Sequence, residues 1–451
     1  MKKIFLLIAI LTLPAFIVGQ DINKTLEDRL TTAPVGSSIS AALIDQSGTK
    51  FYYTGKTSKQ ADARPVDQNT VYEIGSITKV FTGILLAEAV KRGEVKLDDP
   101  ISKYLPTTVK TPKFNGKEIT LLDLTTQSSG LPSLPDDFKP KNPNNPYADY
   151  TVDRLYDFLG RVELKHDIGT KFEYSNLGVG LLGHILALRA KMGYEELVTT
   201  RILKPLGMKD TAIVFSPSMR SHLAAGHDME GKQTENWDLP TFAGAGALRS
   251  TASDMAKFVA ANLGLSKTPI SDSIAEAQKV RRTFEGSPVK ISFNWITTKS
   301  GGRDIIWHNG GTGGYRTFVG MDMDQKKGVF VATNSADSVD DLGFHLLNSD
   351  VPLRKVEKPK TEITLSETIL DGYVGEYQLA PEFSIVVIRE GNRLFAIATK
   401  QPRFELFAEK EDEFFLKAVE ASVSFTRDEN GKVTGLILHQ GGNNSPGKKI
   451  K

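Results

Sequence analysis

The order of secondary-structure patterns along the chain is the strongest constraint on its fold. Alternating residues at 38–44 and 50–53 flank the turn sequence Asp45-Gln46-Ser47-Gly48, which predicts a β-hairpin. Helical patterns dominate from 76 to 263, and strand patterns return between 289 and 333. Because strands occur at both ends with helices between them, we expect one α/β (α+β) unit whose terminal segments share an antiparallel sheet flanked by helices.

A second unit is predicted after residue 364. Residues 351–364 contain prolines and many charges with little hydrophobic periodicity, which indicates a linker. Short strand patterns separated by turns follow up to residue 439, as in a small antiparallel β-barrel or sandwich. The polar tail 441–451 is expected to fray. We therefore divide the chain into a β-rich domain at 365–451, the linker, and a main domain at 21–350.

The first twenty residues have the pattern of a secretory signal peptide. Lys2-Lys3 precede an apolar run from Ile4 to Val18, and small and polar residues follow it, with expected cleavage near Gly19 or Gln20. This run is shorter than the roughly 20 residues that cross a bilayer, so a permanent anchor is the less favoured interpretation. The chain has no cysteine, which excludes disulfides and lipid attachment at cysteine. We expect a periplasmic or secreted protein with no stable membrane anchor after signal removal.

Charge and histidine placement exclude several classes of partner. The chain has 56 Lys and Arg against 54 Asp and Glu, spread among one another, so no nucleic-acid partner is expected. His222 and His227 have no neighbouring ligands of matching spacing, so neither a metal nor another cofactor is implied. The remaining class of partner is a small-molecule or peptide substrate.

Ser76-Ile77-Thr78-Lys79 stands where a polar turn gives way to an apolar helical pattern. A separation of three puts the hydroxyl and the amine on one helix face, and free N–H groups at a helix N-terminus suit a developing oxyanion. The same spacing recurs at Ser47/Lys50, Ser287/Lys290 and Ser445/Lys448, but only Ser76 opens a helix. Taken alone, the motif also fits an N-cap serine followed by a solvated lysine.

Two further motifs follow in the chain. Tyr174-Ser175-Asn176 precedes the apolar helix pattern that begins at Leu177, and presents a phenol and a carboxamide at the helix entrance. Taken alone, it also fits a packed tyrosine with an Asn N-cap. His308-Asn309-Gly310-Gly311 ends one strand and leads to another. Glycines at such a place let the backbone come close to a ligand.

In this order, Ser76-x-x-Lys79, Tyr174-x-Asn176 and His308-x-Gly310 resemble the three motifs of the serine β-lactamase and penicillin-binding-protein superfamily. The likeness is greatest to class C-like members and to related esterases and D-amino-acid amidases. It runs from about residue 38 to 334, with similar flanking sequences at 124–132, 205–208 and 246–255. The resemblance implies a β-lactamase/transpeptidase-like fold with an all-helical subdomain. Residues 373–439 look like the β-rich domain often appended to such hydrolases.

The resemblance also implies roles for individual residues. Ser76 would be the nucleophile and Lys79 its base, because a lysine desolvated in a cleft loses its proton more easily. Tyr174 would pass that proton to the leaving group. The N–H groups of Ser76 and Gly311 would form the oxyanion hole. The expected catalytic set is Ser76, Lys79, Tyr174 and His308, and the expected substrate-binding set is Asn176, Gly310, Gly311 and Gln127, the last at a position where many relatives carry His.

The third motif bears on the substrate. In class C β-lactamases it usually begins with lysine, a fixed charge that faces the substrate carboxylate, whereas a histidine with the reference pKa of about 6.5 is mostly neutral at pH 7. His308 therefore favours an exported peptidase, amidase or esterase that forms an acyl-enzyme on Ser76 and acts on D-amino-acid amides, peptidoglycan stems or small peptides. A class C-like β-lactamase and a non-catalytic penicillin-sensing or cell-wall-binding protein stay open as alternatives.

Overall fold

The computed structural model describes residues 15–355, 362–399, 401, 403–416, 421–440 and 443–451. The chain forms two compact units, Met1–Val356 and Glu357–Lys451. Residues 1–14 of the expected signal and 356–361 of the expected linker lie outside the described residues, and Ala15–Leu30 form one helix, α1. Among the described helices, none combines the length and apolarity of a membrane span.

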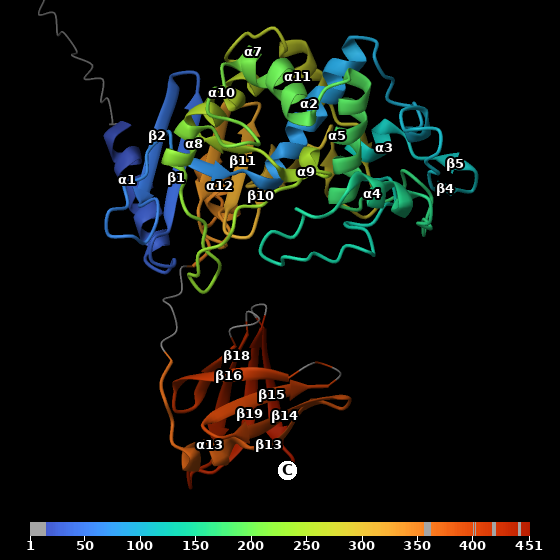
Figure 1. The fold of residues 1–451 in the computed structure, drawn as a ribbon. Helices are drawn as coiled ribbons and strands as arrows, with labels where there is room; N and C mark the ends of the chain where they lie inside the picture. The colour runs from blue at the N-terminus through green and yellow to red at the C-terminus, as the bar shows by residue number, and fades with distance from the viewer. Residues whose placement is uncertain (1–14, 356–361, 400, 402, 417–420, 441–442) are drawn as a thin grey trace, which may run out of the picture. The chain divides into compact units, whose positions relative to one another are not determined.

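An eight-stranded antiparallel sheet forms the centre of the first unit (Figure 1). Its strands in order are β2 (Gly48–Gly55), β1 (Ser38–Asp45), β12 (Lys327–Thr333), β11 (Arg316–Asp322), β10 (Arg303–Gly311), β9 (Ile296–Ser300), β8 (Lys290–Ile291) and β7 (Arg282–Thr283). β1 pairs with β12, with Ala41 opposite Val331. The two ends of the unit thus share one antiparallel sheet, which confirms the expectation from the element order.

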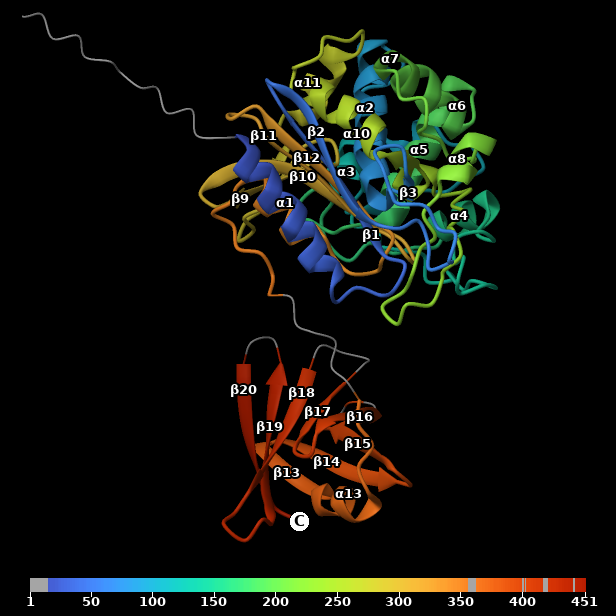
Figure 2. The ribbon, with the colours of Figure 1, turned by 90° about the vertical axis from the view of Figure 1, so that its left-hand side faces the viewer.

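Helices cover both faces of this sheet. Alternate residues of β12 point to opposite sides, so Val329 and Val331 pack with α1 and α12 (Asp340–Leu347) while Phe330 and Ala332 join the main core. Figures 1 and 2 show α1 on one side of the sheet and the larger set of helices on the other. Burial of each large apolar side chain contributes about 1.5–3 kcal/mol.

The larger helical layer carries two of the expected site residues, Lys79 and Asn176. Its helices are α2 (Thr78–Lys91), α3 (Leu121–Thr125), α4 (Val152–Leu159), α5 (Asn176–Ala190), α6 (Tyr194–Val198), α7 (Lys204–Leu206), α8 (Pro217–His222), α9 (Ala243–Gly246), α10 (Ala252–Asn262) and α11 (Ser271–Gln278). α2 and α5 are apolar all round and buried along most of their length, as core helices are. A short pair of strands joins β3 (Val71–Glu73), which precedes α2 in the chain, to β6 (Arg249–Thr251), which precedes α10. A second such pair joins β4 (Lys113–Phe114) and β5 (Lys117–Glu118).

The second unit is a closed antiparallel barrel. Its elements are α13 (Glu367–Tyr373), β13 (Gly375–Ala380), β14 (Phe383–Glu390), β15 (Arg393–Ala398), β16 (Arg403–Lys410), β17 (Glu413–Phe415), β18 (Ala421–Arg427), β19 (Val433–Gln440) and β20 (Asn443–Lys449). Buried aromatic and aliphatic side chains fill its core, among them Tyr377, Phe414 and Leu436. Of the two expected β architectures, the barrel is the one found.

The expected fraying of the tail is wrong for residues 443–449. This segment forms β20, which pairs with β19 and with β13 and so closes the barrel. Its side chains are mostly exposed and polar, so the hydrophobic pattern gives no strand signal there. The strand forms because its backbone makes hydrogen bonds to β13 and β19, whose edges would otherwise expose unpaired N–H and C=O groups.

Removal of residues 441–451 is expected to destabilise the second unit, because β13 and β19 then become open edges. A loss of a few kcal/mol lowers the melting temperature of a unit this size by about 10 °C or more. Thermal unfolding of the full chain, followed with limited proteolysis, measures this. The double variant Lys448→Ala/Lys449→Ala keeps the β20 backbone and serves as control. A truncated protein whose second unit melts as the control does would show that β20 is dispensable.

Candidate active site

Ser76 lies in a 3₁₀ turn, Gly75–Ile77, immediately before α2. Gly75 has φ +49°, and a Cβ there would lie 2.7 Å from the amide nitrogen of Gly311. Both the left-handed backbone and the close approach of β10 therefore require glycine. Of the other Ser-x-x-Lys serines, Ser47 lies in the β1–β2 turn, where its hydroxyl bonds Asp45. Ser76 is thus held against the end of β10 at the start of a buried helix.

Three oxygen atoms surround the amine of Lys79. Its Nζ lies 2.9 Å from Ser76 Oγ, 2.7 Å from Asn176 Oδ1 and 2.7 Å from the carbonyl oxygen of Ala245. Lys79 has no exposed surface, and no carboxylate pairs with it in the part of the chain that the structure describes. Burial lowers its pKa well below the usual value for lysine. In the neutral amine, two N–H groups serve the two carbonyl oxygens and the lone pair is left to face the Ser76 hydroxyl.

Tyr174 lies beside both Ser76 and Lys79. Its ring centroid is 4.8 Å from Lys79 Nζ, and the Ser76 hydroxyl is within hydrogen-bond reach of its phenol. Burial raises the pKa of Tyr174, and the hydrogen bond with Ser76 opposes this increase only in part. The phenol therefore keeps its proton at working pH and acts as a donor.

His308 is buried on β10 and its ring centroid lies 6.2 Å from that of Tyr174. Its Nδ1 is 2.6 Å from the carbonyl oxygen of Asn309, which keeps the ring proton on Nδ1 and leaves Nε2 as an acceptor. Burial, with the nearby amine of Lys79, lowers the pKa of His308 to about 3. The imidazole is therefore neutral at all ordinary pH values, more firmly than its reference pKa implies.

Glycines bring the end of β10 onto the turn that carries the serine. A Cβ on Gly310 would lie 2.0 Å from the carbonyl oxygen of Ile74, so no other residue fits between the two backbones. Thr317 on β11 donates to the same carbonyl oxygen, at 3.0 Å. Gly311, the next residue, is exposed and ends the strand. The backbone of Gly311 thus borders the site beside Ser76, where an oxyanion donor is expected.

Asn176 and Gln127 differ in what their side chains do. Asn176 accepts from Lys79, and its Nδ2 lies 3.5 Å from the Tyr147 hydroxyl. Gln127 is buried; its Oε1 accepts from the Ser175 amide at 2.8 Å, and its Nε2 donates to Asn294 at 3.2 Å. Both polar atoms of the Gln127 side chain are therefore engaged within the protein, where they support the segment that carries Tyr174.

Sequence reasoning missed Ala245, which contacts Lys79, and the buried carboxylate of Glu73, which lies close to Ser76 in the chain. The carbonyl of Ala245 accepts from Lys79; Gly244 and Gly246 flank it, and such glycines signal close backbone approach. Glu73, three residues before Ser76, is buried, pairs with Arg249 at 3.3 Å, and has its pKa raised by burial. No motif marks a carboxylate of this kind, because its partner is distant in sequence.

Comparisons with known proteins identify the family to which the chain is similar. The Beta-lactamase family model matches residues 27–347, and the Domain of unknown function DUF3471 matches residues 359–447. The D-alanyl-D-alanine-carboxypeptidase/endopeptidase AmpH of Escherichia coli K12 is 28% identical over 354 residues, which cover 74% of this chain and 90% of that protein. Penicillin-binding protein 4* of Bacillus subtilis is 26% identical over 442 residues, 89% of this chain and 92% of that protein.

A solved structure and a further relative indicate the same family. A class C β-lactamase from Rhodobacter sphaeroides superposes with a TM-score of 0.61 at 25% identity and covers 74% of this chain and 97% of its own. A β-lactamase of Pseudomonas fluorescens is 26% identical over 348 residues, which cover 70% of this chain and 93% of that protein. The chain therefore belongs to the β-lactamase family and is a serine hydrolase of the β-lactamase and penicillin-binding-protein superfamily.

Proposed function

We propose that this chain is an exported hydrolase, periplasmic or secreted, that cleaves an amide or ester bond of D-amino-acid peptides, amides or related esters through an acyl-enzyme on Ser76. The observation that carries this proposal is the buried amine of Lys79, 2.9 Å from Ser76 Oγ, with no carboxylate partner among the described residues. Export is supported by the N-terminal pattern of two lysines and an apolar run.

Acylation follows from these contacts. The neutral Lys79 amine takes the Ser76 proton as Oγ bonds to the substrate carbonyl carbon, and the oxyanion is stabilised by the N–H groups of Ser76 and Gly311. When the intermediate collapses, the leaving nitrogen or oxygen takes the Tyr174 proton. The Lys79 ammonium then returns a proton to Tyr174, which restores both groups.

Deacylation uses the same groups in the reverse sense. A water molecule gives its proton to the Lys79 amine as its oxygen attacks the acyl carbon, and the Lys79 ammonium gives that proton to Ser76 Oγ as it leaves. Asn176, Gly310 and Gly311 contact the acyl group, and Gln127 serves the site through Ser175. The neutral His308 offers Nε2 as an acceptor and no positive charge.

The neutral imidazole favours uncharged amides and esters over β-lactams, because a substrate carboxylate meets no fixed positive charge at His308. The similarity to AmpH, named a carboxypeptidase and endopeptidase, supports the same choice. A β-lactamase is the second candidate, favoured by the similarity to the enzyme of Pseudomonas fluorescens. Relative turnover of nitrocefin, D-alanyl amides and short-chain esters separates the two.

A fluorophosphonate or a penicillin is expected to leave a covalent adduct on Ser76, seen by mass spectrometry of the intact chain and its peptides. The adduct should be absent in Ser76→Ala. Ser47→Ala, which removes the serine of another Ser-x-x-Lys sequence, should label as the parent does. An adduct on a different residue, or labelling that survives in Ser76→Ala, would defeat the assignment of the nucleophile.

A further inference from the structure

Glu73 is a buried carboxylate that the proposed mechanism does not use. It ends β3, three residues before Ser76, and stands opposite Arg249 of β6. The side chains of this ion pair are each 3% exposed, and a guanidinium nitrogen lies 3.3 Å from a carboxylate oxygen. An ion pair buried in this way is often no more stabilising than apolar side chains of the same size, so stability alone does not account for its presence.

The first carboxylate oxygen, Oε1, connects β3 to Trp237. It accepts from the backbone N–H of Trp237 at 2.9 Å and from Arg249 Nη2 at 3.3 Å. The same Nη2 donates to the carbonyl oxygen of Trp237 at 2.5 Å. The indole packs against the turn that follows β10, since a Cβ on Gly313 would lie 3.0 Å from its Nε1. Glu73 thus fixes a tryptophan that contacts the chain two residues beyond Gly311.

The second oxygen, Oε2, is left for the residue that follows Gly311. Oε2 and the Thr312 hydroxyl are both buried, and neither has a hydrogen-bond partner among the described residues. Burial raises the pKa of Glu73, and Arg249 and the nearby Thr312 hydroxyl oppose this increase. A buried donor and a buried acceptor that lie close together without other partners are satisfied by a slight approach to one another.

The backbone at Thr312 sets the direction of the Gly311 amide. The Thr312 N–H donates to the carbonyl oxygen of Tyr315 at 3.1 Å. Because an antiparallel pair exchanges hydrogen bonds at every second residue, the Gly311 N–H points away from β11. A Cβ on Gly75 would lie 2.7 Å from the Gly311 nitrogen, so this amide lies against the turn that carries Ser76. A displacement of Thr312 therefore displaces the expected oxyanion donor.

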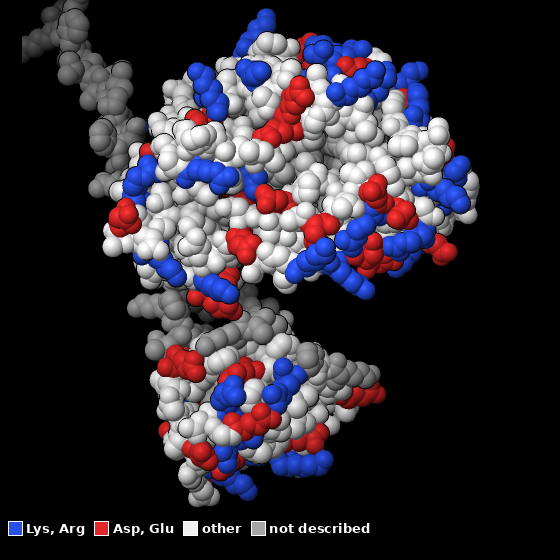
Figure 3. Space-filling model, viewed as in Figure 1, with Lys and Arg blue, Asp and Glu red and all other residues white. Residues whose placement is uncertain are grey.

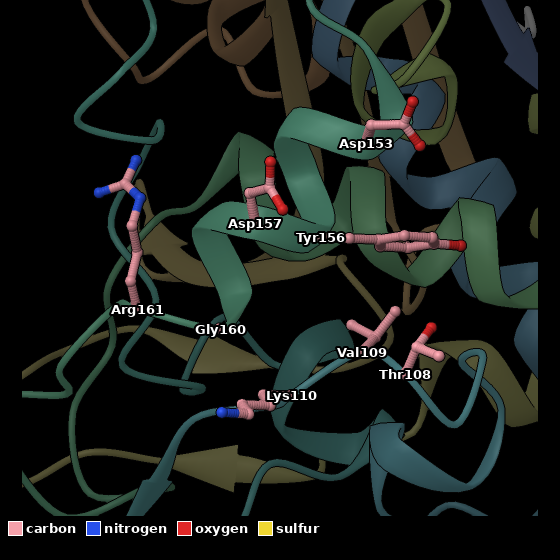
Figure 4. Close-up of a pocket in the computed structure, with 8 residues that line it drawn as sticks. All are labelled: Thr108, Val109, Lys110, Asp153, Tyr156, Asp157, Gly160 and Arg161. Carbon is pink, nitrogen blue, oxygen red and sulfur yellow. The ribbon is translucent and has the colours of Figure 1, made fainter.

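Exposed acidic side chains differ from Glu73. On the face in Figure 3, acidic and basic side chains are interspersed at the surface. Figure 4 shows a cavity of about 540 Å³ that contains none of the site residues, with Asp153, Asp157 and Arg161 directed away from one another. Exposed charges of this kind contribute little to the stability of the neighbouring structure. Glu73 is distinguished by its burial and by its hydrogen bond to a backbone amide.

We infer that Glu73 is a positioning residue for the hydrolysis proposed at Ser76. Its Oε2 accepts from the Thr312 hydroxyl while Oε1 holds Trp237. The Gly311 amide, which precedes Thr312 in the chain, is thereby kept where the oxyanion forms. Glu73 touches no reacting atom and acts through these neighbours. The inference rests on the proposed function and adds to it the side chain that holds one oxyanion donor in place.

The test measures kcat and KM of the full chain for p-nitrophenyl acetate, together with the affinity for phenylboronic acid. Boron bonds to Ser76 Oγ and becomes tetrahedral, which puts an oxygen where the oxyanion forms. Glu73→Gln is expected to lower kcat about 10- to 100-fold with KM within a few-fold, and to weaken boronic acid binding by a similar factor. Thr312→Val, which keeps the ion pair with Arg249, should lower both about five-fold, as the loss of one hydrogen bond does.

Glu88→Gln and Thr297→Val are the matched controls. Glu88 is likewise buried and paired with an arginine, Arg92, at 3.2 Å. The Thr297 hydroxyl is likewise buried without a partner in the described part of the chain. Both controls should keep the kcat and the boronic acid affinity of the parent. The melting temperature of Glu88→Gln should fall as that of Glu73→Gln does, because each variant leaves a charged arginine without its carboxylate.

A folded Glu73→Gln or Thr312→Val protein with the kcat and boronic acid affinity of the parent would overturn the inference, as would equal losses in the two controls. Circular dichroism establishes folding, and Thr312→Val alone decides the matter when Glu73→Gln does not fold. A parent chain with neither ester turnover nor labelling of Ser76 would instead overturn the proposed function.

Discussion

Lys79→Arg is expected to lower kcat/KM for p-nitrophenyl acetate about 10³-fold, within the range that a general base contributes. Arginine stays protonated at every working pH, so it cannot take the Ser76 proton. The native amine can, because burial lowers its pKa and no described carboxylate holds the charge in place. Steady-state kinetics and the rate of Ser76 labelling by a fluorophosphonate measure the loss.

The pH dependence of kcat/KM tests the same role of Lys79. A base with a lowered pKa is active above that pKa, so kcat/KM should fall as the pH drops through the Lys79 titration, at a pH well below 10.5. His308 adds no step near pH 6.5, because its pKa is about 3. The acid limb should therefore persist in His308→Gln and vanish from the residual activity of Lys79→Arg. An unchanged limb in Lys79→Arg would assign the base to another group.

Much of this candidate site could be predicted from residues that are close together in the sequence. Ser76 and Lys79 are three residues apart at the start of an apolar helix, and Tyr174 and Asn176 flank Ser175, which caps α5 by accepting from Gly178. Such neighbours are brought together by one turn of backbone, so their spacing predicts their geometry. The pairing of β1 with β12 was likewise predictable, because strands at both ends of one α/β unit must find a common sheet.

The features that could not be predicted depend on contacts between residues that are far apart in the sequence. The strand patterns expected between 289 and 333 are interrupted after β8. Asn294 has φ +61° and its backbone N–H donates to the carbonyl oxygen of Thr125, while the backbone N–H of Phe293 donates to the carbonyl oxygen of Ala277. The carbonyl of Ala245 serves Lys79 without any side-chain signal. Residues 443–449 form β20 because closure of the barrel, not their own polar side chains, provides the hydrogen bonds. Tertiary contacts of this kind override local patterns.

Gly310→Ala is expected to lower kcat about 10²- to 10³-fold, the loss typical of a missing oxyanion donor. The added Cβ would lie 2.0 Å from the carbonyl oxygen of Ile74 and 2.5 Å from Thr317 Oγ1, so β10 must move away from the turn that carries Ser76. The Gly311 amide moves with it, and leaves the place where the oxyanion forms. Turnover of short esters and amides measures the effect, with circular dichroism to establish that the variant is folded.

Gly193→Ala is the matched control, because a Cβ there meets nothing within 4 Å and the φ of −64° suits alanine. Loss of kcat in Gly310→Ala with KM within a few-fold of the parent would follow from a displaced donor that acts only on the transition state. Full activity in a folded Gly310→Ala protein would mean that the backbone of β10 does not stabilise the oxyanion. The donor pair would then have to be sought around Ser76 itself, at the amides of the turn that Gly75 begins.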